Sequence, residues 1–207
     1  MISEPYSEQT ARWPPRGRHI LGQFDDSSIV VYQAFRQSIA AHAVSAQRFG
    51  GEFSYSRMSW IKPNFLWMMY RCSWASKEGQ ERVLAIRLSR IFFDELLRLA
   101  VSSSYDAQRF ASQQAWQSAI AASDVRLQWD PDHDPTGRPI ERRAVQLGLR
   151  GETLRRYGER EPISIEDVTP FVLQQRENLQ GRFENLLIPA ERVYGPELTA
   201  ARAVGVD

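Results

Sequence analysis

The sequence of 207 residues predicts a single α+β domain with a mixed or mostly antiparallel sheet flanked by helices. Its composition, 43% hydrophobic and 25% charged residues, is that of a globular chain long enough to bury one substantial core. Predicted strands and helices interleave irregularly with short connections, which favours α+β over a regular βαβ array. No repeat or linker divides the chain. We therefore expect an irregular N-terminal arm over residues 1–17, one domain over 18–195, and a frayed tail over 196–207.

The first half of the expected domain contains one strand and two helices. Residues 28–35 (SIVVYQAF) predict a strand, and their nearly continuous apolar character is typical of a central strand covered on both faces. Residues 36–49 predict a helix that ends at a pair of glycines. Residues 62–74 predict a second helix, because Pro63 is well placed in a first helical turn.

The second half alternates strands and helices. The expected elements are a strand over 82–89 (RVLAIRLS), helices over 92–101 and 107–122, strands over 125–129 and 143–149, a short helix over 151–157, a short strand over 163–166, and a last helix over 168–179. The strands at 125–129 and 143–149 are expected to pair across a loop rich in proline and aspartate.

Charge and cysteine content exclude several classes of protein. The chain has 26 basic and 25 acidic residues, so no overall field draws it to nucleic acid or to an anionic membrane. The longest uncharged apolar stretches are far shorter than the roughly 20 residues that a membrane span needs, and no secretory signal is visible. A single cysteine, Cys72, permits no internal disulfide and fits a reducing compartment. We expect a soluble, cytoplasmic protein without a membrane partner.

Arginine is the usual cation of this chain, and only Lys62 and Lys77 are lysines. Lys77 lies in a turn, where a surface role explains it. Lys62 precedes Pro63 at the predicted start of a helix, where a cation is disfavoured by a few tenths of a kcal/mol and an anion is favoured. We therefore expect Lys62 to line the main polar cleft together with Arg57 or Arg71, where an anion completes the site.

The segment 57–74, RMSWIKPNFLWMMYRCSW, holds three of the six tryptophans. On a helix, Asn64, Trp67, Arg71 and Trp74 share one side, while the other side is the better core face. Such a face can stack on a planar ring while a guanidinium holds a phosphate or carboxylate. The alternative is that the tryptophans belong to the core and the arginines cap carbonyls or extend to solvent.

Polar side chains also interrupt the predicted strands. Tyr32 and Gln33 end the first strand, Arg87 falls inside the strand at 82–89, and Gln146 lies in the middle of the strand at 143–149. Each of these groups needs a partner if it is buried. They form either the lining of a polar cleft or a satisfied buried network.

Five stretches of the sequence resemble one family. They are IVVYQAF, RMSWIKPNFLWMMYRCSWASKEGQERVLAIRL, VRLQWDPDHD, RAVQLGLRGE and ISIEDVTP, and the match that they indicate spans roughly residues 22–193. The sequence is similar to the bacterial and fungal "domain of unknown function 4291" family, and the long tryptophan-rich motif is specific. The resemblance implies a single-domain protein and brings no activity with it.

A weaker resemblance is to the ADP-ribosyltransferase fold, through a strand that ends Tyr-Gln-Ala, a helix, an aromatic segment and the strand VLAIRL. This resemblance implies NAD as a cofactor, held between a first-strand histidine or arginine and later aromatic residues, with a late glutamate acting on it. In this sequence Gln33 stands at the position of that histidine. The late glutamate is Glu152 or Glu166.

The leading functional hypothesis is an enzyme that acts on a nucleotide or a nucleic-acid end. We expect Trp67 or Tyr70 to stack on the base, and Arg57, Lys62 and Arg71 to bind phosphate. Tyr32 and Gln33 would orient the ribose, and Arg87 and Gln146 would line the rest of the cleft. Glu166 or Glu152 would stabilise the positive charge that develops on the sugar. The alternative is a non-catalytic module that binds single-stranded RNA or a modified base through the same aromatic residues. A third possibility is a protein-interaction domain with exposed tryptophans.

No metal site is expected. The spacing of Asp130, Asp132, Asp134 and Glu141 resembles a calcium-binding loop, but a proline replaces its central glycine and the preceding segment reads as a strand. A solvated turn is the favoured interpretation. The histidines share no metal-ligand spacing with one another or with the cysteine.

Overall fold

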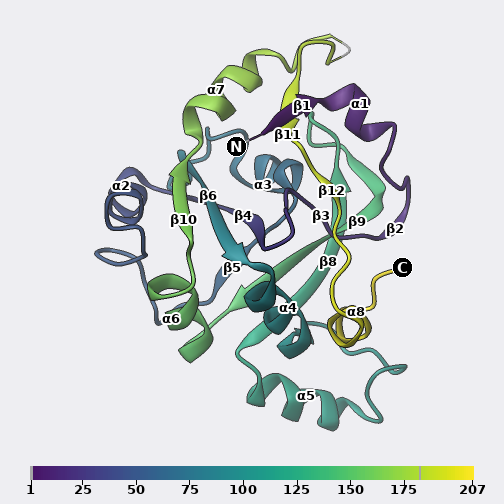
Figure 1. The fold of residues 1–207 in the computed structure, drawn as a ribbon. Helices are drawn as coiled ribbons and strands as arrows, with labels where there is room; N and C mark the ends of the chain where they lie inside the picture. Colours follow the sequence, from purple (N-terminus) through teal and green to yellow (C-terminus); the bar gives the residue numbers. More distant parts are fainter. Residues whose placement is uncertain (1, 182) are drawn as a thin grey trace.

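Two sheets form the centre of the fold in a computed structural model that describes residues 2–181 and 183–207 (Figure 1). The first sheet is antiparallel and has the order β10–β6–β4, with β4 at Ser28–Phe35, β6 at Arg82–Ser89 and β10 at Ser164–Asp167. The strands expected at 28–35, 82–89 and 163–166 are therefore present. The expectation that 28–35 is the central strand is wrong, because β6 lies between the other two.

The second sheet is built on a long antiparallel hairpin, β8 (Val125–His133) and β9 (Pro139–Leu149). The strand pair expected at 125–129 and 143–149 is confirmed, and both strands extend further toward the turn. Three short strands complete the sheet: β2 (Gly17–Arg18), β5 (Ser59–Ile61) and β7 (Val101–Ser102). Because β2–β9 and β7–β8 are parallel pairs, this sheet is mixed.

Helices cover the sheets and correspond to those expected from the sequence. They are α2 (Gln37–Ala46), α3 (Phe65–Cys72), α4 (Arg90–Leu99), α5 (Gln113–Ala122), α6 (Gly151–Glu159) and α7 (Thr169–Glu177). Two of these helices start several residues later than expected: α5 begins at Gln113 rather than at 107, and α3 begins at Phe65 rather than at 62. The start of α3 is set by its cap. Its N-cap is Asn64, whose side chain accepts a hydrogen bond from the Trp67 N–H at 2.6 Å, so Pro63 lies before the helix.

Both faces of the first sheet are buried. Along β4, Ile29 and Val31 face one apolar cluster, while Val30 and Tyr32 face the other, as the two-residue period of a strand requires. The first cluster includes apolar residues of α2, α4 and α6, and the second includes those of α3 and α7. This burial explains the continuous apolar sequence of β4. In the described part of the chain, no helix is long and apolar enough to cross a membrane.

The N-terminal segment is ordered and docked, contrary to the irregular arm expected at 1–17. It forms β1 (Ser3–Pro5) and α1 (Tyr6–Thr10), and β1 pairs with β11 (Leu187–Pro189). Gln9 is fully buried and donates to the Pro189 carbonyl at 3.0 Å. Local sequence could not show this, because the partners lie about 180 residues away.

The C-terminal segment is also ordered, contrary to the frayed tail expected at 196–207. Helix α8 (Leu198–Val204) packs against α4 and buries Ala200 and Val204 (Figure 1). A further short pair, β3 (Leu21–Gly22) with β12 (Arg192–Val193), connects the same region to the core. The alanine-rich composition of the tail reflects close helix packing.

Candidate functional site

A cleft of about 890 Å³ opens where β4 ends, between the two sheets. Its walls come from the end of β4, the start of α2, the loop over residues 52–58, β5, α3, the turn over residues 78–81, β8 and β9. The polar lining consists of the cations Arg36, Arg57, Lys62 and Arg71, the amides Gln33, Gln80, Gln128 and Gln146, and the acids Glu52, Glu78 and Glu81. Three aromatic residues, Phe35, Phe53 and Trp60, also line it.

Lys62 is the most deeply placed cation of the cleft, with 3% of its surface exposed. Its backbone is fixed to β4, because the Tyr32 N–H donates to the Lys62 carbonyl at 2.7 Å and the Lys62 N–H donates to the Tyr32 carbonyl at 3.3 Å. Its ammonium lies 5.4 Å from the centre of the Trp67 ring. Burial, and secondly the charge of Arg71, lower the pKa of Lys62 to about 8, while Asp130 opposes the shift.

The cleft has unpaired positive charge. Within residues 2–181 and 183–207, no carboxylate lies within ion-pair distance of Arg57, Lys62 or Arg71. Two of the acidic residues that line the cleft have other partners. Glu52 pairs with Arg36 at 3.5 Å, and Glu81 accepts a hydrogen bond from the Gly79 N–H. The arrangement therefore favours an anion beside the three cations.

Trp60 supplies the aromatic surface of the cleft. It lies on β5 opposite Gly148 of β9 and is half-buried. A Cβ atom added at Gly148 would lie 3.0 Å from the indole ring and 2.7 Å from the Met58 sulfur. The absence of a side chain at this position thus allows both side chains to pack closely on β9.

The amides of the cleft differ in how far their hydrogen bonds are used. Gln33 donates to the Ser59 hydroxyl at 2.8 Å and to the Trp60 carbonyl at 3.1 Å, and it accepts from the Tyr157 hydroxyl at 2.7 Å. Gln33 therefore holds β4, β5 and α6 together. Because its amide nitrogen already donates two hydrogen bonds, it has little capacity left to orient a ribose, which was its expected role. The amide nitrogen of Gln146 donates to Gln128 and Asp130, both at 2.7 Å.

The tryptophan–arginine face expected on α3 is not formed. Trp67 and Trp74 are 6% and 7% exposed, because the β8–β9 hairpin covers this side of the helix. The Trp74 indole donates to the Pro135 carbonyl at 3.0 Å. Tyr70 is exposed but stacks on His133 at 3.6 Å between ring centres, outside the cleft lining. These residues are core or hairpin contacts, which was the alternative interpretation of the sequence.

The remaining predicted residues lie away from the cleft. Tyr32 is fully buried beneath α3. Arg87 donates to the Ser28 hydroxyl at 2.8 Å and pairs with Asp25 at 3.3 Å. Glu166 faces solvent on β10, and Glu152 faces solvent in the first turn of α6. Neither glutamate lines the cleft. Glu166 is kept from it because β10 lies on the far side of β6 from β4.

The acidic hairpin is part of the packing of the protein. Asp132 is buried and pairs with the buried Arg142 at 2.7 Å, so the expectation of a solvated turn is wrong at Asp132. Asp134 closes the turn by accepting from the backbone N–H groups of Thr136 and Arg138 at 2.9 and 3.0 Å. In the part of the chain that the structure describes, no group of His, Cys, Asp and Glu side chains could hold a metal ion.

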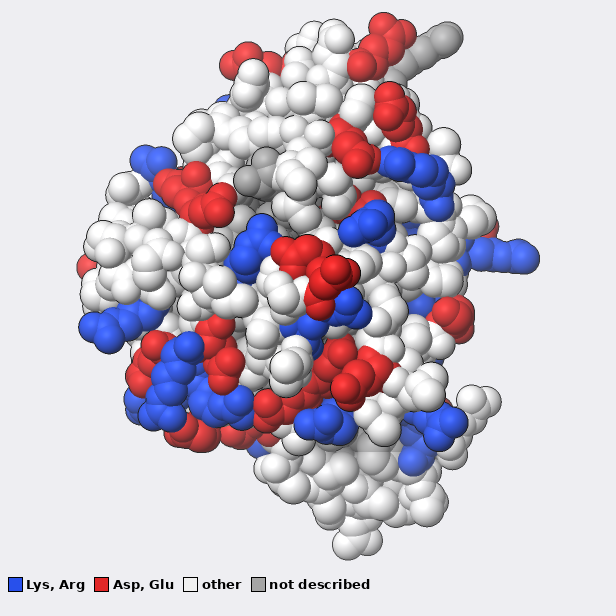
Figure 2. Space-filling view, in the orientation of Figure 1, with Lys and Arg blue, Asp and Glu red and all other residues white. Residues whose placement is uncertain are grey.

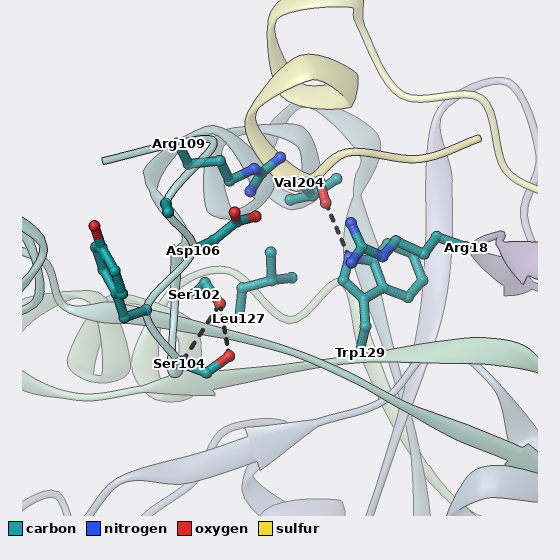
Figure 3. Close-up of a pocket in the computed structure, with 10 residues that line it drawn as sticks. Arg18, Ser102, Ser104, Asp106, Arg109, Leu127, Trp129 and Val204 are labelled. Atoms are coloured by element: carbon teal, nitrogen blue, oxygen red, sulfur yellow. Dashed lines mark hydrogen bonds between the residues drawn. The ribbon is translucent and has the colours of Figure 1, made fainter. Parts of the chain in front are cut away.

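A second pocket, of about 320 Å³, lies between β8, the loop over residues 103–112 and α8 (Figure 3). Two of its polar groups bind the last carbonyls of α8. Arg109 donates to the carbonyls of Ala203 and Arg202 at 2.8 and 3.2 Å, and the Trp129 indole donates to that of Val204 at 2.9 Å. The residues that line this pocket therefore serve mainly to fix the C-terminal end of α8.

Charge is mixed over the face of the molecule shown in Figure 2, where basic and acidic groups alternate. This agrees with the formal net charge of +1. On that face no continuous basic stripe is visible. The unpaired cations of the cleft are thus a local feature.

The hypotheses drawn from the sequence assigned no ligand-binding role to Trp60 or Gln128. The strand β5, which positions Trp60, was not expected, because three residues are too few to show a strand period. Gln128 could have been found from the sequence, because it is a polar residue between Leu127 and Trp129 in the strand VRLQW.

Comparison with known proteins identifies a family. A family model described as "Domain of unknown function (DUF4291)" matches residues 19–194. No curated protein matches the chain. The matched range includes every residue that lines the cleft and excludes β1, α1, β2 and α8.

Proposed function

The chain belongs to the DUF4291 family, and we propose that its cleft binds a nucleotide, free or at the end of a nucleic acid. The phosphate is held by Lys62, Arg57 and Arg71, and the base lies against Trp60. The observation that carries this proposal is the buried Lys62 ammonium, which has two further cations beside it in the cleft and no carboxylate partner within the described residues. Such a charge is best compensated by an anionic ligand.

The size and lining of the cleft favour a nucleotide over a small inorganic anion. A volume of about 890 Å³ is within the range of sites for cofactor-sized ligands. Trp60 offers a ring for stacking, and Gln128 and Gln146 offer amide groups for the edge of a base. A phosphate ion would use only the cations.

The alternative, a module for single-stranded RNA, has less support. A strand needs successive stacking surfaces, and Trp67 and Trp74 are buried. The mixed charge in Figure 2 provides no basic track for a backbone. NAD remains one nucleotide to test, but the proposal is limited to binding, because Glu152 and Glu166 lie outside the cleft.

Isothermal titration calorimetry tests the proposal with inorganic phosphate, AMP, ATP and NAD. We expect at least one nucleotide to bind more tightly than phosphate. Lys62→Ala and Arg71→Ala should each weaken this binding by about tenfold or more, as expected for loss of a charge-assisted contact.

Lys77→Ala is the matched control, because it removes the other lysine from an exposed turn. Circular dichroism and thermal melting show whether each variant is folded. Absence of binding by every nucleotide at millimolar concentration, or unchanged binding by folded Lys62→Ala, contradicts the proposal.

A further inference from the structure

The surroundings of Lys62 differ from those of an ordinary surface lysine. The ammonium of a surface lysine is strongly hydrated, whereas this side chain is 3% exposed and borders an aromatic ring. The charged groups that act on it are Arg71 of α3 and Asp130 of β8. The Cys72 thiol of α3 also lies near, and burial raises its pKa, so it is neutral at about pH 7. Asp130 accepts a hydrogen bond from Gln146 at 2.7 Å and forms no ion pair with Lys62.

We propose that Lys62 is also a nucleophile, whose amine attacks the carbonyl carbon of a phosphorylated aldehyde bound in the cleft and forms an imine. This inference rests on the proposed function, because the phosphate of the aldehyde would occupy the same cationic subsite. Arg57 and Arg71 would hold that phosphate, while the Lys62 amine would be left free to attack the carbonyl carbon. The ligand class combines a phosphate with a free aldehyde, whether on an aromatic ring or on an open-chain sugar.

The position of the amine supports this chemistry. The backbone of Lys62 is held by two hydrogen bonds to Tyr32, and Pro63 follows it, so the side chain starts from a rigid point. Its ammonium borders a cleft large enough for the electrophile. Desolvation and a neighbouring cation both favour the neutral, nucleophilic form of a lysine. With a pKa of about 8, roughly one Lys62 in ten is neutral at about pH 7.

The covalent step balances without another reactant. The amine nitrogen forms a bond to the carbonyl carbon, and the carbonyl oxygen takes a proton to become a hydroxyl. This hydroxyl then leaves as water with the second proton lost from the nitrogen. The product is a carbon–nitrogen double bond, and no oxidant or reductant is consumed. Borohydride, added in the experiment, reduces the imine to a stable secondary amine.

Lys62 and Lys77 are the only lysines of the chain, so labelling of lysine side chains can be compared between just two positions. The full chain is incubated with pyridoxal 5′-phosphate, reduced with borohydride and digested, and the modified peptides are quantified by mass spectrometry. Ribose 5-phosphate is the second probe and represents an open-chain sugar.

We expect Lys62 to be modified more than about tenfold faster than Lys77 at about pH 7, although Lys77 is exposed. The rate at Lys62 should rise with a midpoint near pH 8. Equal or faster modification of Lys77, or a midpoint for Lys62 near 10.5, overturns the proposal. Preference for one probe identifies which aldehyde the cleft accepts.

Failure of this inference is distinguishable from failure of nucleotide binding. Lys62→Arg keeps a cation but cannot form an imine, so it should retain measurable nucleotide binding and lose labelling at residue 62. Nucleotide binding without labelling of Lys62 overturns the nucleophile and leaves the binding proposal. Labelling of Lys62 that nucleotides do not slow supports the nucleophile and contradicts a shared subsite.

Discussion

At Lys62 the chain keeps an ammonium in surroundings that disfavour its charge. Burial and Arg71 lower the pKa of this lysine from 10.5 to about 8. A shift of that size means that the charged side chain destabilises the folded state whenever it remains protonated. Residues that lower stability at a cleft are typical of functional sites.

Replacing Lys62 with methionine should therefore stabilise the protein. Methionine keeps an unbranched apolar side chain beside Trp67 and removes the buried charge. At about pH 7 we expect a gain of about 3 kcal/mol in the free energy of unfolding, measured by urea denaturation. Because the lysine pKa is lowered on folding, the gain is complete below pH 8 and declines as pH rises toward 10.5. A less stable Lys62→Met would show that the ammonium has a structural partner.

Arg142 and Asp132 form the most deeply buried ion pair of the described residues, with side chains that are 5% and 1% exposed. Arg142 also donates to the Pro14 carbonyl at 2.8 Å and lies over the Trp13 ring. The pair therefore connects the hairpin to the N-terminal segment.

Arg142→Met should destabilise the protein by about 3–5 kcal/mol, because the buried Asp132 carboxylate loses its cationic partner and keeps only the hydrogen bond from the His133 N–H. The double variant with Asp132→Leu should recover much of this loss, since no buried charge remains. Urea denaturation of the single and double variants provides the comparison. A single variant with near wild-type stability would show that Asp132 becomes protonated or solvated at little energetic cost.

At the scale of elements, the contact between β5 and β9 shapes the cleft. Trp60 and Met58 pack where Gly148 has no side chain. A larger residue on β9 would therefore move the indole ring while leaving the strand register in place.

Gly148→Ala should weaken nucleotide binding by several-fold, because the new Cβ would lie 3.0 Å from the Trp60 ring and displace it. Gly195→Ala is the matched control, since nothing lies within 4 Å of a Cβ at that position. Titration calorimetry measures binding, and tryptophan fluorescence reports the displacement of the ring. Unchanged affinity with a displaced ring would remove Trp60 from the proposed site.

Helix α8 is held by its ends and by its buried face. Ala200 and Val204 are fully buried, and Arg109 and Trp129 bind the carbonyls that end the helix.

A chain that ends at residue 196 should melt several degrees lower, because α4 loses its apolar cover. Leu198→Ala is the control, since that side chain is 78% exposed and should leave the melting temperature unchanged. A shortened chain with wild-type melting would show that α8 contributes little.

At the scale of the whole molecule, charge balance limits the ligands. A formal net charge of +1 gives little long-range attraction to a polyanion, and the cations of the cleft act only at short range. The molecule is therefore suited to one nucleotide more than to a long strand.

A mononucleotide and a ten-residue oligonucleotide with the same terminal nucleotide should bind with affinities that agree within about threefold, since a cleft of about 890 Å³ accommodates about one nucleotide. Fluorescence anisotropy over a range of salt concentrations measures both. Affinity that grows with length and falls steeply with salt would favour the RNA-binding module.

The sequence by itself determined the elements whose signals are local. The strands β4 and β6 follow from continuous β-branched and aromatic runs, and α2, α3 and α4 follow from their apolar spacing and end signals. The rarity of lysine in a chain rich in arginine also identified Lys62 as a candidate site residue. These features depend on residues close together in the chain, so pattern and propensity are sufficient to find them.

The tertiary structure decided which predicted site residues meet. It paired β1 with β11. It also packed the β8–β9 hairpin on α3, which buried Trp67 and Trp74. It also separated Glu152 and Glu166 from the cleft and placed Trp60 over Gly148. Each of these outcomes depends on contacts between distant segments, and a helical face shows its spacing in the sequence but not the element that packs on it.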